Sequence, residues 1–231
     1  MERIVRESEL TYAYLCECTE KLQKRYPFAE VGSIGTTCLG RRIPSVTLGS
    51  GDRHILYIGG THAQEWMTTL LLLRFTEELL SSYAAHGAVA GFDARGLLSG
   101  KTLIIIPSLN PDGTEIALRG SSAAGRYTSL CENALKYGRS LWNANARGVD
   151  INHNFDASWN IMHELEQKAG INAPAPRRYG GTEPESEPET RAVTAFCRNN
   201  DISGCLSFHS QGEEIFWEYG ENTPEQSFTI A

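Results

Sequence analysis

Gly59-Gly60-Thr61-His62-Ala63-Gln64-Glu65-Trp66 joins a predicted strand, His54 to Ile58, to a leucine-rich helical pattern, Met67 to Tyr83. The two glycines allow the chain to turn sharply where the strand ends. In open α/β sheets, ligands bind beyond the carboxyl ends of the strands. Zinc accepts a histidine nitrogen and a glutamate oxygen. We therefore expect His62 and Glu65 to supply two ligands of a metal ion, with a third from elsewhere in the chain.

Two more apolar runs predict strands that are buried in a parallel sheet. Residues 103–106 are continuously apolar and rich in β-branched side chains, and residues 205–208 form a second short run that ends at His209. The succession of strand, helix and strand is typical of a βαβ unit. We predict a single α/β domain over residues 1–231, with a central mixed, mainly parallel sheet and helices on both faces.

The remaining elements follow from local signals. Residues 84–100, 107–113, 120–148 and 172–188 are typical of turns and loops, and residues 148–156 alternate like an extended segment. The sequence further predicts a helix over 8–26 that Ser8 caps and that ends at Pro27, an edge hairpin formed by 29–35 and 43–48, and a helix to about residue 199 that begins with a Ser186-x-x-Glu189 capping box.

Composition excludes several classes of partner. The chain has 231 residues, 41% of them hydrophobic, and a formal net charge of −7, which argues against nucleic acid and anionic membranes as partners. No apolar run approaches the roughly 20 residues that span a bilayer. The charged N-terminus lacks a signal-peptide core, and the six cysteines show no C-x-x-C pair. We expect a cytoplasmic protein with reduced thiols.

His209 repeats the placement of His62, because both follow an apolar strand. A parallel sheet would bring both to one edge, and Glu65 would complete a catalytic zinc set with one open position. The alternative is a capping or core histidine. Asp150 is the candidate acceptor for the second N–H of a ligand histidine, or else a turn aspartate. Arg147 could stabilise an oxyanion or lie on the surface. Arg126 and Arg139 are the next candidates for the same role.

Together these residues form an ordered set of motifs. The chain resembles the zinc carboxypeptidase family (carboxypeptidase A-like metallopeptidases) over essentially its whole length. Within that family, the sequence of its motifs most resembles that of bacterial peptidases that cut γ-D-glutamyl-diaminopimelate bonds of cell-wall peptides. The motifs that carry the resemblance are His62-Ala63-Gln64-Glu65-Trp66, Asn110-Pro111-Asp112-Gly113, Asn145-Ala146-Arg147-Gly148-Val149-Asp150-Ile151-Asn152-His153-Asn154-Phe155, Ser186-Glu187-x-Glu189 and Phe208-His209-Ser210.

The resemblance implies one Zn²⁺ per chain, held by His62, Glu65 and His209, with Asp150 behind a ligand histidine. It implies that Asn152 and His153 meet the terminal carboxylate of a peptide or muropeptide substrate, and that Ser210 and Gln211 lie beside the substrate backbone. Hydrolysis would use a metal-activated water, and Arg147 is our candidate for the oxyanion.

Three departures from the family pattern change these expectations. The family has Asn-Arg where this chain has Asn152-His153, and a guanidinium suits a carboxylate better than imidazole does. The family's oxyanion arginine aligns with Asn143. The family's catalytic glutamate comes several dozen residues after the last zinc ligand, whereas this chain ends 231 − 209 = 22 residues after it, and none of Glu213, Glu214, Glu218 and Glu221 has the family context.

These departures leave three hypotheses for the function. The first is a zinc metallopeptidase domain that is C-terminally incomplete relative to the family. The second is a zinc-binding protein that recognises a peptide end without turnover, because it lacks the general-base glutamate. The third is a related zinc amidohydrolase of small N-acyl amino acids. An incomplete domain would also leave a sheet edge uncovered, which predicts self-association.

Overall fold

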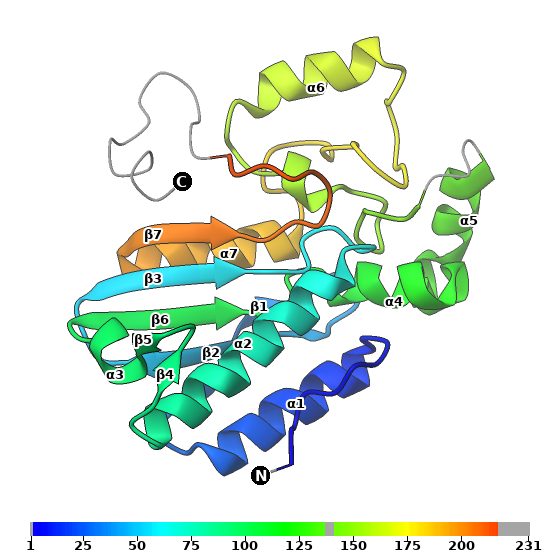
Figure 1. The fold of residues 1–231 in the computed structure, drawn as a ribbon. Coiled ribbons are helices and arrows are strands. Elements are labelled where there is room, and N and C mark those ends of the chain that lie inside the picture. The colour runs from blue at the N-terminus through cyan, green and yellow to red at the C-terminus, as the bar shows by residue number, and fades with distance from the viewer. Residues whose placement is uncertain (1, 137–140, 217–231) are drawn as a thin grey trace.

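A mixed five-stranded sheet forms the centre of the computed structural model, which describes residues 2–136 and 141–216 (Figure 1). Its strands are β1 (Glu30–Thr36), β2 (Arg42–Gly49), β3 (Arg53–Ile58), β6 (Lys101–Ile106) and β7 (Ile202–Ser207), in the order β1-β2-β6-β3-β7. β3 pairs in parallel with β6 and β7, whereas β2 is antiparallel to β1 and β6. The predicted mixed sheet with a parallel centre and an edge hairpin is confirmed.

Helices cover both faces of this sheet. In Figure 1, α1 (Tyr12–Arg25) and α2 (Trp66–Ala84) lie on one face and α7 (Pro188–Asn200) lies on the other. Side chains alternate along β6, so that Leu103 and Ile105 join the apolar cluster of α1 and α2, and Ile104 and Ile106 join that of α7. A strand with both faces covered needs apolar side chains on both, which explains the continuous apolar run at residues 103–106.

The predicted helix caps were wrong, although the helices exist. Thr11, not Ser8, caps α1 and accepts a hydrogen bond from the Tyr14 amide. Glu187 is the N-cap of α7 and makes no side-chain cap hydrogen bond. The Ser186 hydroxyl donates to the Glu187 carboxylate instead. The capping-box pattern therefore marked the start of a helix but not the contacts of its side chains, because Ser186 accepts from the distant Asn154 and Glu189 accepts from the distant Cys38 amide.

Several predicted loops contain regular structure. Residues 84–100 hold a small hairpin and one helical turn, Asn110 caps a helix that begins at Pro111, and residues 120–148 contain two helical segments. The extended segment predicted near Asn152 is a 3₁₀ turn. The elements are β4 (Ala88–Val89), β5 (Phe92–Asp93), α3 (Ala94–Leu97), α4 (Pro111–Arg119), η1 (Ser121–Tyr127), α5 (Thr128–Lys136), η2 (Ile151–His153) and α6 (Trp159–Lys168). Short polar elements like these lack the long apolar periodicity that reveals a helix in sequence.

β7 is an edge strand, and its predicted burial was wrong. Its residues are exposed or half-buried, because β3 is its only partner strand among the described residues. Such an edge presents unpaired backbone groups, and the self-association predicted from it stays a prediction. In the same part of the chain, no helix has both the length and the apolar character that a membrane crossing requires.

Candidate metal centre

His62, Glu65 and His209 converge where β3 and β7 end. The Nδ1 atoms of the two histidines lie 3.2 Å apart. Glu65 Oε2 lies 3.0 Å from His209 Nδ1, and Glu65 Oε1 lies 3.2 Å from His62 Nδ1. The predicted metal-ligand set is thus assembled from residues up to 147 positions apart in sequence.

The local sequence explains how each side chain reaches this point. Gly60 turns the chain with a φ of +58°, and a Cβ there would lie 2.5 Å from Thr69 Oγ1, so glycine is required. Glu65 is the N-cap of α2 but makes no cap hydrogen bond, which leaves its carboxylate free for the histidines. Phe208 N–H donates to the Ile58 carbonyl at 2.8 Å. This bond extends the parallel ladder and brings His209 beside the end of β3.

The three side chains fit a zinc ion. Ligand atoms about 2.0–2.1 Å from a tetrahedral zinc lie about 3.3 Å from one another, close to the observed spacing of 3.0–3.2 Å. Glu65 is 1% exposed, and its Oε1 atom is buried without a hydrogen-bond donor. A buried acceptor without a donor is costly, and coordination to a cation would remove that cost. Two nitrogens and one carboxylate oxygen are the donor set of an open catalytic zinc site.

Asp150 stands behind His62, as predicted for the partner of a ligand histidine. Its Oδ1 lies 3.4 Å from His62 Nε2, while its Oδ2 accepts from the Arg178 amide at 2.8 Å. Because Nε2 faces Asp150, Nδ1 is the nitrogen left to face Glu65 and His209. Such an outer carboxylate fixes the orientation of the ring and raises its basicity as a ligand.

Acidic groups dominate the electrostatics of this centre. Burial by itself would lower the pKa of His62, but contact with the carboxylates of Asp150 and Glu65 outweighs it and raises this pKa to about 9. Burial would raise the pKa of Glu65, yet the two histidines lower it to about 2. The pKa of Asp150 is also lowered, because contact with His62 outweighs its burial. The two carboxylates therefore attract positive charge to the point where the three ligand atoms meet.

We expect Asp150→Asn to weaken zinc binding by about 10- to 100-fold, the usual cost of losing a carboxylate behind a ligand histidine. The amide keeps an oxygen but removes the charge that supports His62. Competition with a fluorescent zinc chelator measures the change. Asp156→Asn, at an exposed position six residues along the same segment, serves as the control. Unchanged zinc affinity in Asp150→Asn would show that this carboxylate does not support the ligand.

The residues that were predicted to bind substrate lie on two segments of the chain. Ser210 and Gln211 follow His209 directly and are exposed. Asn152 is exposed on η2, and His153 N–H donates to the Asp150 carbonyl at 3.0 Å. This turn places Asn152 and His153, which we predict to meet the end group of the substrate, within three sequence positions of Asp150.

The predicted arginines are engaged elsewhere in the part of the chain that the structure describes. Arg147 Nε lies 3.6 Å from Glu187 Oε2, and Arg126 donates to the Cys38 carbonyl at 2.6 Å. Arg139, like Glu218 and Glu221, lies outside the described residues. Asn143 instead lies beside residues 59–65, the metal loop that joins β3 to α2 and carries His62 and Glu65. Its carbonyl accepts from the Ala63 amide at 3.0 Å, and its Oδ1 is buried without a donor.

A second group of possible ligands, Cys38, Asp112 and Glu189, is fully buried. Its carboxylate oxygens are already occupied by donors. Glu189 accepts from the Cys38 amide and Asn145, and Asp112 accepts from the Leu39 amide and Arg41. We interpret this cluster as a structural network that ties α7 to α4, not as a second metal centre. All six cysteines are free thiols, as predicted.

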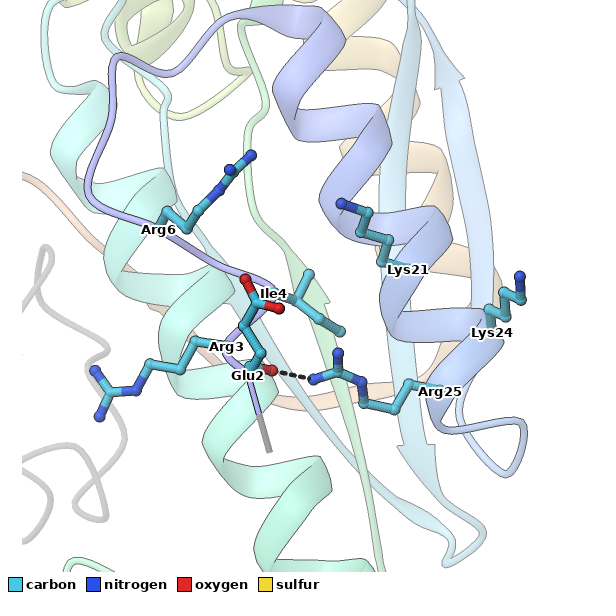
Figure 2. Close-up of a pocket in the computed structure, with 7 residues that line it drawn as sticks. All are labelled: Glu2, Arg3, Ile4, Arg6, Lys21, Lys24 and Arg25. Atoms are coloured by element: carbon cyan, nitrogen blue, oxygen red, sulfur yellow. Dashed lines mark hydrogen bonds between the residues drawn. The ribbon is translucent and has the colours of Figure 1, made fainter.

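A hollow of about 390 Å³ lies between the N-terminal segment and α1, and Figure 2 shows the side chains that line it. Arg25 donates to the Glu2 carbonyl at 2.8 Å and lies 3.5 Å from Glu77. Glu17 lies 2.5 Å from Lys21 Nζ and 3.7 Å from Arg6. Three of the cations that line the hollow are thus paired with carboxylates, namely Arg6, Lys21 and Arg25. None of the metal-centre residues lines the hollow. The lining residues are Glu2, Arg3, Ile4, Arg6, Lys21, Lys24 and Arg25.

An α/β sheet that brings two histidines and a glutamate together at the carboxyl ends of parallel strands carries the donor set of an open zinc site. The zinc carboxypeptidase family model matches residues 15–229. The chain is 33% identical over 221 residues to γ-D-glutamyl-L-diamino acid endopeptidase 1 of Lysinibacillus sphaericus, an alignment that covers 95% of this chain and 55% of that protein. It therefore belongs to the zinc carboxypeptidase family.

Two further comparisons agree with this assignment. Human mast cell carboxypeptidase A is 28% identical over 210 residues, which is 87% of this chain and 45% of that protein. The crystal structure of carboxypeptidase A from Helicoverpa armigera superimposes with a TM-score of 0.69 at 20% identity, over 99% of this chain and 53% of that chain. This likeness shows the fold. The chain spans about half the length of the relatives it matches.

Proposed function

We propose that this chain forms the metal-binding part of a zinc peptidase that hydrolyses an amide bond in γ-D-glutamyl-diamino acid peptides of the cell wall. The observation that carries the proposal is the convergence of His62, Glu65 and His209 within 3.2 Å of one another. The similarity to an enzyme named for γ-D-glutamyl-L-diamino acid peptides supports the choice of substrate, as does His153 where the family pattern has arginine.

Each residue has a proposed role. His62, Glu65 and His209 would hold one Zn²⁺, and Asp150 would orient His62. When bound, zinc supplies Lewis acidity and lowers the pKa of a coordinated water to about 7. Asn152 and His153 would hold the terminal group of the substrate, Ser210 and Gln211 would contact its backbone, and Arg147 would stabilise the oxyanion if substrate binding drew it away from Glu187.

A second candidate is recognition of the same peptide without turnover. Within residues 2–136 and 141–216, Glu65 and Asp150 are the only carboxylates within ion-pair distance of His62 or His209. Both have assigned roles, one as a ligand and one behind a ligand, so neither is free to serve as the general base. This observation favours a binding protein if the chain acts alone.

One experiment separates these candidates. The zinc-loaded chain is incubated with γ-D-glutamyl-L-lysine, with an ordinary peptide that has a free C-terminus, and with an N-acetyl amino acid. Release of lysine from the first substrate, and its loss in His62→Ala, is the expected result. Binding of γ-D-glutamyl-L-lysine without hydrolysis would favour the recognition protein. Cleavage of the N-acetyl amino acid alone would overturn the peptidase proposal in favour of an amidohydrolase.

A further inference from the structure

Glu166 is a buried carboxylate that the metal centre does not use. It lies on α6, is 4% exposed, and holds His153 Nδ1 at 2.8 Å through Oε1. Its Oε2 accepts from the Gly180 amide at 3.0 Å and lies 3.6 Å from His163 Nδ1. In Figure 1, α6 lies apart from the helices that cover the sheet. The carboxylate therefore serves something other than the packing of the sheet.

The partners of Glu166 show what it holds. Burying a carboxylate is costly unless a cation or hydrogen bonds compensate for it. In the described part of the chain no lysine or arginine lies within ion-pair distance of Glu166, whose partners at that distance are His153 and His163. The His153 contact is the shorter by 3.6 − 2.8 = 0.8 Å. His153 is therefore the nearer of the two side chains that face the buried carboxylate.

The surroundings of Glu166 keep it in place. The Trp159 ring stacks on His163 with 4.3 Å between ring centroids, and Trp159 Nε1 donates to the Gly180 carbonyl at 2.9 Å. Gly180 thus donates its N–H to Glu166 and accepts from Trp159. These contacts lock α6 onto the segment at Gly180, so Glu166 meets His153 from a rigid support.

This contact determines which nitrogen of His153 is available. An ionised carboxylate only accepts hydrogen bonds, so Nδ1 of His153 carries the proton that faces Glu166. Nε2 is then the ring nitrogen that remains for a ligand. In the imidazolium form Nε2 is also a donor, and the ring would lie between two carboxylates, one from Glu166 and one from the ligand.

We propose that Glu166 is a positioning residue that makes His153 specific for a free terminal carboxylate on the substrate. This inference rests on the proposed function, in which His153 meets the terminal group. The turn at η2 links His153 to Asp150 and so to the metal ligand His62. A chain with imidazole instead of a guanidinium has fewer fixed donors for a carboxylate. Glu166 offsets this by fixing the ring through Nδ1 at 2.8 Å, so that Nε2 is the nitrogen left for the ligand.

The test compares two probes that differ only at the terminus, γ-D-glutamyl-L-lysine and its C-terminal carboxamide. Calorimetric titration of the zinc-loaded chain measures both affinities without requiring turnover. We expect wild type to prefer the free acid by about tenfold, because charge-assisted hydrogen bonds are about twice as strong as neutral ones. Glu166→Gln keeps an oxygen for Nδ1–H but removes the charge, and should reduce the preference to about twofold with little change in carboxamide affinity.

A double-mutant cycle shows whether Glu166 acts through His153. We expect His153→Ala to lose the preference as well, and Glu166→Gln to add nothing in the His153→Ala background, because coupled residues are not additive. Glu164→Gln is the control on the same helix, since its side chain is 71% exposed. Zinc content of each variant confirms that the metal centre is intact.

The outcomes distinguish a failure of the proposed role of Glu166 from a failure of the proposed function. If Glu166→Gln retains the tenfold preference, or if the two losses add, the role of Glu166 is overturned while the proposed function stands. If wild type binds both probes equally, the carboxylate specificity is overturned. If the zinc-loaded chain binds neither probe, the proposed function fails and this inference fails with it.

Discussion

Glu65→Gln is expected to lower the zinc affinity of this chain by well over 100-fold. The carboxylate lies 3.0 Å from His209 Nδ1 and 3.2 Å from His62 Nδ1, where it would be the only anionic ligand. A neutral amide is a poor zinc ligand, and it leaves two imidazoles that cannot hold the metal alone. Losing a group behind a ligand costs about 10- to 100-fold, so the loss of a ligand should cost more.

Zinc content after dialysis against a zinc buffer of defined free concentration measures this effect. The matched control is Glu78→Gln, an exposed glutamate on the same helix, α2, which should retain one zinc per chain. Circular dichroism of both variants establishes that the fold persists. Full zinc occupancy in Glu65→Gln at micromolar free zinc would contradict the assigned ligand set.

Glu189→Gln should make the protein more stable at pH 8 than wild type, by an amount that approaches 3 kcal/mol. Glu189 is completely buried in the network with Cys38 and Asp112. Burial, with the nearby charge of Asp112, raises its pKa to about 7 despite hydrogen bonds that lower it. The ordinary pKa of a glutamate is 4.5. Each tenfold change in an acid dissociation constant corresponds to about 1.4 kcal/mol, so the rise from 4.5 to about 7 sets an upper limit of about 3.5 kcal/mol.

The sign follows from proton binding in the two states. Between about pH 4.5 and 7, folded Glu189 keeps its proton while the unfolded chain has lost it, so unfolding releases a proton and stability falls as the pH rises. Below pH 4.5 both states are protonated and the penalty is absent. Glutamine carries no charge at any pH, and its oxygen can still accept from the Cys38 amide, as Glu189 Oε1 does at 3.1 Å.

Urea unfolding at pH 5 and pH 8, with chelator present throughout, tests this prediction. The stability difference between Glu189→Gln and wild type should shift in favour of the variant at pH 8. Glu164→Gln, whose side chain is 71% exposed, should show no such shift. An equal difference at both pH values would mean that Glu189 is ionised throughout, held by Asn145 and the Cys38 amide.

The resemblance to a known family predicted more of the candidate site than the local sequence patterns did. The motif order predicted the ligand set and the place of Asp150, both of which the structure brings together. Local patterns located the strands and the long helices but misplaced the caps of α1 and α7 and missed α5 and α6. The cap of α7 was misplaced because Ser186 and Glu189 each bond to a distant segment, Ser186 to the Asn154 side chain and Glu189 to the Cys38 amide.

By itself the sequence determined the strand, turn and helix around His62 and Glu65, because those residues are neighbours and their conformations depend on local glycines and apolar periodicity. It also determined that the centre of the sheet is parallel, since buried apolar runs alternate with a helix. Only the tertiary structure decided that Glu166 holds His153, that Asn143 lies against the metal loop, and that β7 is an exposed edge. These facts depend on contacts between distant segments and on which strand lies last in the sheet, and no local pattern records either.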